Sequence, residues 1–312
     1  MINYWSAGIY PRNEKLIEST RSYDKTLEKQ FKKEKSRLLR IQLNNKLDYI
    51  SDPLIDWDDN LRPFTDNLKG IERGPLTRYY ENNTFYRQPI IKSKIGTTGN
   101  ILKNSICFDL FTSKSKVKID ILDPFTFYDL SANEFYRSEE EAVNAFAEII
   151  KKELNSLKKD VQLIQFNSPS LARIEEADRL NMVKKAMEKI VKGLDTKTCL
   201  NLWGSDISNT LEEFQEFPVD IIGIDFTSSN IDKFDKIEMK KGLACGLIDA
   251  KNTKMEKSSD IIRELKNIKK TFNPESLSVI TSWDFEFIPE SFADKKLQIM
   301  KQIKEKSKMM KL

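Results

Sequence analysis

Short apolar runs alternate with longer amphipathic stretches along most of this chain, and that alternation limits its fold more than any other feature. Apolar runs that end at turn residues predict strands, and apolar residues three and four positions apart predict helices. Strands are predicted at residues 3–9, 47–50, 117–122, 161–166, 198–203, 220–225, 243–248 and 277–280. Helices are predicted at residues 15–44, 173–191, 208–214 and 260–268, after a cap at Ser138, and from residue 291 onward. Eight strands joined by helices in 312 residues favour an α/β fold of the (β/α)8 TIM-barrel type over a doubly wound sheet.

One segment, residues 57–109, is too long for a single connection and is predicted to be a hairpin insertion after the second strand. It holds four glycines and an aromatic cluster, which are Gly70, Gly74, Gly96, Gly99, Tyr79, Tyr80, Phe85 and Tyr86. The cluster fits two roles equally well, a patch that faces a partner and packing of the hairpin on its own barrel. No Ser-rich or Gly-rich linker divides the chain, so residues 1–312 are predicted to form one domain, with residues 301–312 as a frayed tail.

The composition argues against several classes of site. Histidine is absent, which removes the most common acid–base group and the most common zinc ligand. Cys107, Cys199 and Cys245 are far apart and lie beside apolar residues, which favours core packing over a metal site or a disulfide. The net charge of +4 comes from mixed signs, which argues against nucleic-acid binding. No apolar run is long enough to span a membrane and no signal sequence is recognised, so a cytoplasmic protein is predicted.

In a TIM barrel the chemistry lies at the carboxyl ends of the strands. The candidates for substrate or donor binding there are Arg12, Lys15, Asp123, Asn167, Trp203, Asp225, Asp249, Trp283 and Asp284. A mouth without thiolate or imidazole suits a flat heteroaromatic ring with a polar tail better than nucleophilic or zinc catalysis, so no catalytic residue is predicted. Paired carboxylates could instead perform acid–base chemistry, although aspartates at strand ends also cap helices and hold arginines.

Eight motifs occur in order along the chain, most of them at predicted strand ends. They are Gly8-Ile-Tyr-Pro-Arg12, Thr77-Arg-Tyr-Tyr-Glu-Asn-Asn-Thr-Phe-Tyr-Arg-Gln-Pro89, Asp123-Pro-Phe-Thr126, Gln165-Phe-Asn-Ser-Pro-Ser-Leu171, Leu202-Trp-Gly-Ser205, Phe217-Pro-Val-Asp220, Leu247-Ile-Asp-Ala-Lys-Asn252 and Ser282-Trp-Asp-Phe-Glu-Phe-Ile-Pro289. Together they resemble the motifs of the cobalamin-independent methionine synthase family from about residue 7 to residue 301. That family is a tandem duplication of two barrels, and the carboxyl-terminal barrel holds zinc and homocysteine. This chain is similar to the zinc-free amino-terminal barrel, as a stand-alone version of the archaeal type.

The departures from the family's catalytic barrel concern its metal site. At the four zinc-ligand positions this chain carries Asn201, Trp203, Asp225 and Trp283, and Asp225 alone will not hold the ion. The resemblance therefore implies that the chain binds no metal and no cofactor of its own, that zinc belongs to a partner, and that the isolated chain transfers no methyl group.

The resemblance also implies roles for two basic residues and two tryptophans. Arg12 and Lys15 match positions at which the amino-terminal barrel presents basic residues, which implies contact with the acidic glutamate tail of a folate donor. The alternative is that Arg12 pairs with Asp249 or Asp284 across the barrel mouth. Two tryptophans at the mouth, at positions 203 and 283, could stack on a pterin ring, and the alternative, which we favour, is that they plug the barrel.

These observations lead to one main hypothesis and two alternatives. The chain is predicted to be a methionine-synthase-like protein of methionine biosynthesis, the non-zinc subunit that helps bind a methyltetrahydropterin-type donor. A zinc-bearing partner barrel would then carry out methyl transfer to homocysteine. The alternatives are a free-standing pterin- or small-molecule-binding barrel and an unrelated enzyme that uses mouth carboxylates such as Asp225 and Asp284. Whether the donor is a folate, a modified pterin or a corrinoid stays open.

Overall fold

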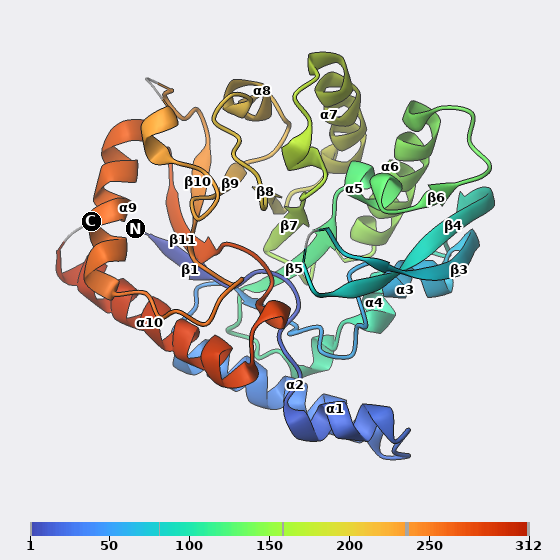
Figure 1. Cartoon of the computed structure of the whole chain (residues 1–312), viewed down its shortest axis with the longest axis horizontal. Coiled ribbons are helices and arrows are strands. Elements are labelled where there is room, and N and C mark those ends of the chain that lie inside the picture. The colour runs from blue at the N-terminus through green and yellow to red at the C-terminus, as the bar shows by residue number, and fades with distance from the viewer. Residues whose placement is uncertain (1, 81, 158, 235–236, 311–312) are drawn as a thin grey trace.

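Eight parallel strands form a nearly closed barrel, which confirms the predicted TIM-barrel fold (Figure 1). The computed structural model describes residues 2–80, 82–157, 159–234 and 237–310. The strands follow the order β1-β11-β10-β9-β8-β7-β5-β2. Their bounds are β1 Asn3–Trp5, β2 Ile50–Ser51, β5 Val117–Leu122, β7 Leu163–Asn167, β8 Lys197–Leu202, β9 Ile221–Asp225, β10 Gly242–Ile248 and β11 Leu277–Thr281.

Strands β1 and β2 stand at the two ends of this order, and contacts just before β2 hold the seam between them. The Asp48 backbone N–H donates to the Tyr4 carbonyl at 2.8 Å, and the Asp48 carboxylate accepts from the Tyr4 N–H at 2.8 Å. Strand β1 is shorter than the predicted residues 3–9. Gly8 has a φ of +60°, a left-handed conformation that turns the chain away from the strand direction.

Helices surround the barrel (Figure 1). The longer ones are α1 Glu14–Arg21, α2 Leu27–Asn44, α6 Glu139–Asn155, α7 Ala177–Val191, α9 Ser258–Phe272 and α10 Glu290–Met309. The short ones are α3 Arg62–Asn67, α4 Ile101–Ser105, α5 Pro124–Asp129, α8 Leu211–Gln215 and the 3-10 turns η1 Phe108–Leu110, η2 Leu171–Arg173, η3 Ile231–Lys233 and η4 Phe285–Phe287. The predicted cap of α6 is confirmed, since the Ser138 hydroxyl accepts from the Glu141 N–H at 3.2 Å. None of the helices in the described part of the chain is long and apolar enough to cross a membrane.

Two helix predictions were wrong in extent. The predicted helix at residues 15–44 is divided into α1 and α2 around Tyr23, whose φ of +50° is incompatible with a continuing helix. The predicted frayed tail is helical as far as Met309, because Ile303 is buried in the core and Lys304 binds the Asp48 carboxylate at 2.6 Å. Residues 311 and 312 of that predicted tail lie outside the described residues.

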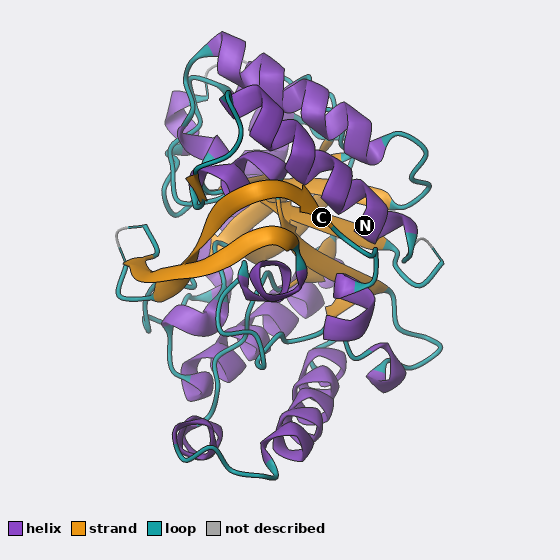
Figure 2. Cartoon of the chain, turned by 90° about the vertical axis from the view of Figure 1, so that its right-hand side faces the viewer, coloured by secondary structure: helices purple, strands orange, loops and turns teal. Residues whose placement is uncertain are grey.

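The insertion is a long antiparallel hairpin, as predicted, formed by β3 Lys69–Arg78 and β4 Phe85–Gly96. It appears as the two long curved strands at the front of Figure 2. The short strand β6 Ala132–Asn133 pairs with β4 in parallel. Tyr79 and Tyr86 are buried in the common hydrophobic core, whereas Phe85 is 46% exposed. Most of the aromatic cluster therefore packs the hairpin onto its own barrel.

Candidate functional site

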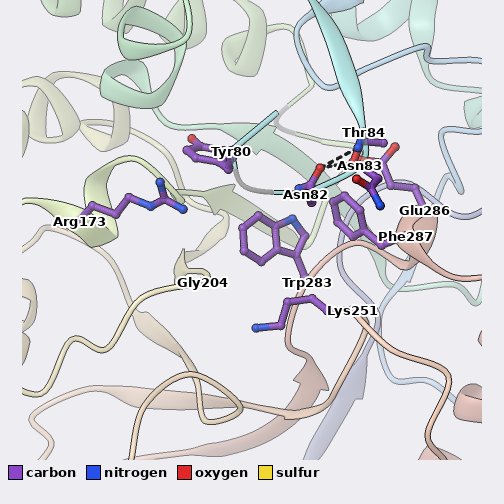
Figure 3. A pocket seen from close by; sticks show the side chains of 10 residues that line it. All are labelled: Tyr80, Asn82, Asn83, Thr84, Arg173, Gly204, Lys251, Trp283, Glu286 and Phe287. Atoms are coloured by element: carbon purple, nitrogen blue, oxygen red, sulfur yellow. Dashed lines mark hydrogen bonds between the residues drawn. The ribbon is translucent and has the colours of Figure 1, made fainter. Parts of the chain in front are cut away.

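The carboxyl ends of the barrel strands open into a cavity of about 520 Å³ under the turn of the hairpin (Figure 3). We call it the mouth cavity. Its lining residues come from the hairpin turn and from the loops after β7, β8, β10 and β11: Tyr80, Asn82, Asn83, Thr84, Arg173, Gly204, Lys251, Trp283, Glu286 and Phe287. The volume lies in the range of roughly 300–1,000 Å³ that is usual for small-molecule sites.

Trp283, which packs against the buried ring of Trp203, forms the floor of the mouth cavity. The rings of Trp203 and Trp283 have centroids 5.4 Å apart and planes at 31°. Gly204 has a φ of +67°, and a Cβ there would lie 2.1 Å from the Trp283 ring, so only glycine fits below this indole. Trp203 is fully buried and plugs the barrel, while Trp283, at 4% exposed, lines the cavity.

A chain of hydrogen bonds ties the hairpin turn to the barrel. Ser170 donates to the Asp129 carboxylate at 2.6 Å, so the Tyr80 hydroxyl, 2.6 Å from the Ser170 hydroxyl oxygen, must act as the donor to it. Burial raises the pKa of Tyr80 well above 10, which keeps this donor protonated. The Tyr80 backbone has a φ of +51°, a strained conformation for a bulky residue. The hydrogen bonds from Tyr80 to Ser170 and from Ser170 to Asp129 therefore hold the hairpin turn, which forms the roof of the cavity, against the barrel.

The two cations of the mouth cavity differ in their partners. Lys251 lies 3.3 Å from the Asp225 carboxylate and donates to the Ser228 hydroxyl at 2.9 Å. The guanidinium of Arg173 lies 4.4 Å from the centroid of the Tyr80 ring, and no described residue forms an ion pair with it. Arg173 is therefore the cation that is available to an anionic ligand.

Asp225, a predicted donor-binding residue, is engaged by three loops. Its Oδ1 accepts from the N–H and hydroxyl of Thr227 at 2.9 and 2.6 Å. Its Oδ2 accepts from the Gly204 N–H at 3.2 Å, from the Ser228 hydroxyl at 2.8 Å and from Lys251. With both oxygens occupied, this carboxylate stabilises the loops of the mouth.

Three carboxyl groups lie close enough to one another to interact, and we call them the acidic wall: Asp59, Asp284 and Glu286. Asp284 is fully buried, and its Oδ2 accepts from the Asn60 amide at 2.9 Å, while its Oδ1 has no partner among the described residues. Burial and then the neighbouring Glu286 raise the pKa of Asp284 well above 3.8. Burial and then Asp59 raise the pKa of Glu286 from 4.5 to about 8. Burial also raises the pKa of Asp59, against the effect of its ion pair with Arg62.

Asn167, another predicted site residue, lies inside the barrel in a buried polar network. Its Oδ1 accepts from the Gln165 amide at 2.8 Å. Gln165 also donates to Asp120 at 3.1 Å and accepts from the Trp5 indole at 2.7 Å. Asp120 forms a fully buried ion pair with Lys118. Asn167 therefore belongs to the barrel interior and does not line the mouth cavity.

Asp123 and Asp249 stabilise turns. Asp123 is fully buried and caps α5 by accepting from the N–H groups of Phe125 and Thr126 at 2.8 and 3.1 Å. Burial raises the pKa of Asp123 from 3.8 to about 6. Asp249 accepts from the Lys251 N–H at 2.8 Å within its own loop. Neither residue lines the mouth cavity.

Arg12 and Lys15 line a second cavity of about 910 Å³, which lies beside the mouth cavity. The Arg12 guanidinium donates to two backbone carbonyls at the start of the insertion and pairs with Asp58 at 3.1 Å. The alternative pairing of Arg12 with Asp249 or Asp284 was wrong, because the insertion brings Asp58 closer. Lys15 is exposed on the rim of this cavity.

The donor set at the family's metal positions does not fit zinc. Asn201 and Trp203 are neutral and fully or almost fully buried, Trp283 offers no ligand atom, and the oxygens of Asp225 are occupied. Across residues 2–80, 82–157, 159–234 and 237–310, no group of three or more Cys, Asp or Glu side chains is arranged to hold a metal ion.

Sequence reasoning missed three residues that shape the mouth cavity. Tyr80 was predicted only as part of an aromatic cluster, and Arg173 and Glu286 were not predicted at all. Arg173 and Glu286 lie further along the loops after β7 and β11, whereas the predicted site residues are the first ones after each strand. Treating the whole loop after each strand as part of the mouth would have included them.

Comparison with known proteins agrees with this geometry. Residues 69–273 match the model of a family described as "Cobalamin-independent synthase, N-terminal domain". The methionine synthase of Saccharolobus islandicus (strain Y.G.57.14 / Yellowstone #1) is 26% identical, over 94% of this chain and 91% of that protein. The B12-independent methionine synthase from Shewanella sp. W3-18-1, solved in complex with selenomethionine, superposes with a TM-score of 0.72 at 17% identity, covering 99% of both chains. A putative vitamin-B12-independent methionine synthase from Listeria monocytogenes gives 0.73 at 15% identity, covering 98% of both chains. This chain belongs to the cobalamin-independent methionine synthase family, and within it to the amino-terminal type.

Proposed function

We propose that this chain is the zinc-free subunit of a two-part methionine synthase, in which it helps bind a methyltetrahydropterin-type donor. A separate zinc-bearing barrel would then activate homocysteine. The mouth cavity carries the proposal, because it combines an aromatic floor with an available cation and a carboxyl group. Figure 3 shows Arg173 and Glu286 on opposite sides of Trp283. Relatives that carry the name methionine synthase support the class of reaction.

The cavity suits a flat ring that carries an anionic tail. A ring can stack on Trp283 and contact Tyr80 and Phe287, which are all in the lining. An acidic glutamate tail then reaches Arg173, which no described carboxylate neutralises. Arg12, to which the resemblance assigned this role, already pairs with Asp58. We therefore propose Arg173 as the main contact of the tail in this chain.

The proposed division of labour follows from the chemistry that this chain lacks. Methyl transfer to homocysteine needs an activated thiolate as the nucleophile. Here that thiolate is the one of homocysteine, and the donor set at the family's metal positions does not fit the zinc that would activate it. In the proposal, this chain binds and orients the donor and shields it from water, and the partner activates the homocysteine thiol.

A free-standing pterin- or small-molecule-binding barrel is the second candidate. It is favoured by the volume of the mouth cavity, about 520 Å³, and by its mixed aromatic and polar lining, which suit a small molecule. The carboxylate-dependent enzyme is disfavoured, because Asp225 is occupied by its own loops and Asp284 is fully buried.

Co-purification of the tagged chain from its native extract tests the main proposal, with a zinc assay on whatever accompanies it. We expect a zinc-containing barrel, and methionine formation from homocysteine and methyltetrahydropteroyltriglutamate by the pair but not by this chain alone. Recovery of the chain alone with retained donor binding would support the second candidate. Failure to bind the donor would overturn both.

Variants of Arg173 and Arg12 test where the tail binds. Arg173→Met should weaken binding of the triglutamate donor by about tenfold, and of the monoglutamate donor less, since a lost charge-assisted hydrogen bond costs about that much. Arg12→Met is the matched control and should change both affinities equally. If Arg12→Met weakened triglutamate binding more than Arg173→Met did, the tail would bind in the second cavity.

A further inference from the structure

We propose that the Glu286 carboxylate binds the N–H-rich edge of a flat nitrogen heterocycle of the 2-amino-4-oxopyrimidine type in the mouth cavity. The inference rests on the proposed function, because it states which edge of a pterin-type donor faces which wall. An aminopyrimidinone presents two neighbouring N–H donors, and one carboxylate can accept both in parallel. Among the described residues of the lining, Glu286 is the single carboxylate.

Glu286 is held at the junction of the two cavities. It lies in η4, directly after the loop that carries Trp283, and its backbone N–H donates to the Ile9 carbonyl at 3.1 Å. The side chain is half-buried and lines both the mouth cavity and the second cavity. No described residue donates a hydrogen bond to its carboxyl group or forms an ion pair with it. The backbone is therefore anchored while the carboxyl group is left for a ligand.

An unpartnered indole N–H beside Glu286 is a second, independent observation that supports a polar ligand at this wall. The Trp283 indole N–H is buried and has no acceptor among the described residues. In Figure 3 this nitrogen lies on the side of the ring that faces Phe287. Because buried polar atoms are rarely left unpaired, a ligand edge with both N–H donors and an acceptor fits this wall.

The charges around Glu286 favour a ligand that brings donors. Asp59 and Asp284 are the neighbouring acids, Arg12 is the nearby cation, and Tyr79 adds a buried hydroxyl. Arg12 is occupied by Asp58, so it cannot close over Glu286 as a full partner. Burial and the neighbouring Asp59 raise the pKa of Glu286 to about 8, so the carboxyl group holds its proton more tightly than a solvated glutamate does. A ligand that binds the carboxylate must therefore displace that proton.

The opposite end of the cavity fixes the direction of the ligand. Arg173 lies across Trp283 from Glu286 (Figure 3). With the N–H edge at Glu286, the remainder of the ring covers the indole and its acidic substituents approach the guanidinium. The mouth cavity then matches the polarity of a pterin with an anionic tail, with donors at one end and negative charge at the other.

The experiment compares two pteridines on the full chain by isothermal titration calorimetry. The probes are 2-amino-4-oxopteridine and 2,4-dioxopteridine, in which a carbonyl replaces the amino donor. We expect the wild-type chain to prefer the amino compound by about tenfold, and Glu286→Gln to lose that preference. Titrations in buffers of different ionisation enthalpy should show more proton release per ligand by the wild type than by the variant. Glu14→Gln, at an exposed glutamate in the second cavity, is the matched control.

The outcomes separate this inference from the proposed function. Equal binding of the two pteridines, or unchanged binding by a folded Glu286→Gln variant, would overturn the inference even if donor binding and methyl transfer persist. Glu286-dependent pteridine binding by a chain that recruits no zinc-bearing barrel would keep the inference and overturn the proposed function. Absence of binding by either pteridine would overturn the inference and remove the pterin class as the ligand.

Discussion

Two aspartates at the carboxyl end of the barrel, Asp225 at the end of β9 and Asp284 in the loop after β11, have opposite surroundings. Both are almost completely buried, at 1% and 0% exposure. Asp225 accepts five hydrogen bonds from four residues, whereas Asp284 accepts one, from Asn60, and leaves an oxygen unpaired. A saturated carboxylate stabilises the loops that bind it, and an unsaturated buried one destabilises the fold. The comparison shows that the Asp225 side of the mouth is held by satisfied hydrogen bonds, whereas the Asp284 side contains an unsatisfied buried carboxyl group.

The residues around Asp225 and the residues around Asp284 also come from different parts of the chain. Thr227 and Ser228 follow Asp225 directly, so most of its hydrogen bonds form within one loop. The neighbours of Asp284 come from distant segments: a Cβ on Gly8 would lie 1.2 Å from its Oδ1, and Asn60 belongs to the start of the insertion. The hydrogen bonds of Asp225 to Thr227 and Ser228 can form as their loop folds. The surroundings of Asp284 form only when the barrel is assembled.

The largest expected effect is at Gly204, on the Asp225 side. Gly204→Ala places a Cβ 2.1 Å from the Trp283 ring at a φ of +67°, and should lower the free energy of unfolding by about 2–4 kcal/mol. Gly193→Ala is the matched control, because its φ is +80° but a Cβ there meets no atom within 4 Å; it should cost about 1 kcal/mol. Urea denaturation measures both. Equal losses would show that backbone strain alone matters and that the tryptophan floor can shift.

The next effect tests the two aspartates directly. Asp225→Asn removes the charge that holds Lys251 and should lower the free energy of unfolding by about 2–3 kcal/mol. Asp284→Asn should change it by less than about 1 kcal/mol, because the pKa of Asp284 is already raised well above 3.8 and its neutral form is close to an amide. Urea denaturation at pH 7 provides the measurement. Equal destabilisation by the two variants would show that the two carboxyl groups contribute equally to stability.

Sequence reasoning predicted the barrel because each strand is a local signal. Residues 117–122 match β5 in full, and Ser138 caps α6 as predicted. The ends of elements were less accurate where one residue adopts an unusual backbone conformation, as Gly8 does after β1 and Tyr23 does between α1 and α2. Hydrophobic periodicity contains no information on such φ angles.

The site was predicted less well than the fold, for a related reason. The residues at the strand ends were identified, but whether each faces the cavity depends on partners far away in the sequence. Arg12 pairs with Asp58 of the insertion, and Asn167 turns into the barrel toward Gln165. Glu286 lies within a recognised motif, of which only Trp283 and Asp284 were predicted to belong to the site.

The smallest expected effect is the pH dependence of stability that Glu286 contributes. The pKa of Glu286 is about 8 in the folded chain and close to 4.5 in the unfolded one, so the folded state holds its proton more tightly. Its contribution is complete below about pH 4.5 and is lost as the pH rises toward 8, so stability should fall across that window. Because the side chain is half-buried, solvent screening keeps this change smaller than those at Gly204 and Asp225. Urea midpoints at pH 5 to 9 should fall less steeply for Glu286→Gln than for the wild type, with Glu14→Gln unchanged. Parallel curves for all three would mean that Glu286 is solvated in the empty cavity and that the acidic wall consists of Asp59 and Asp284 alone.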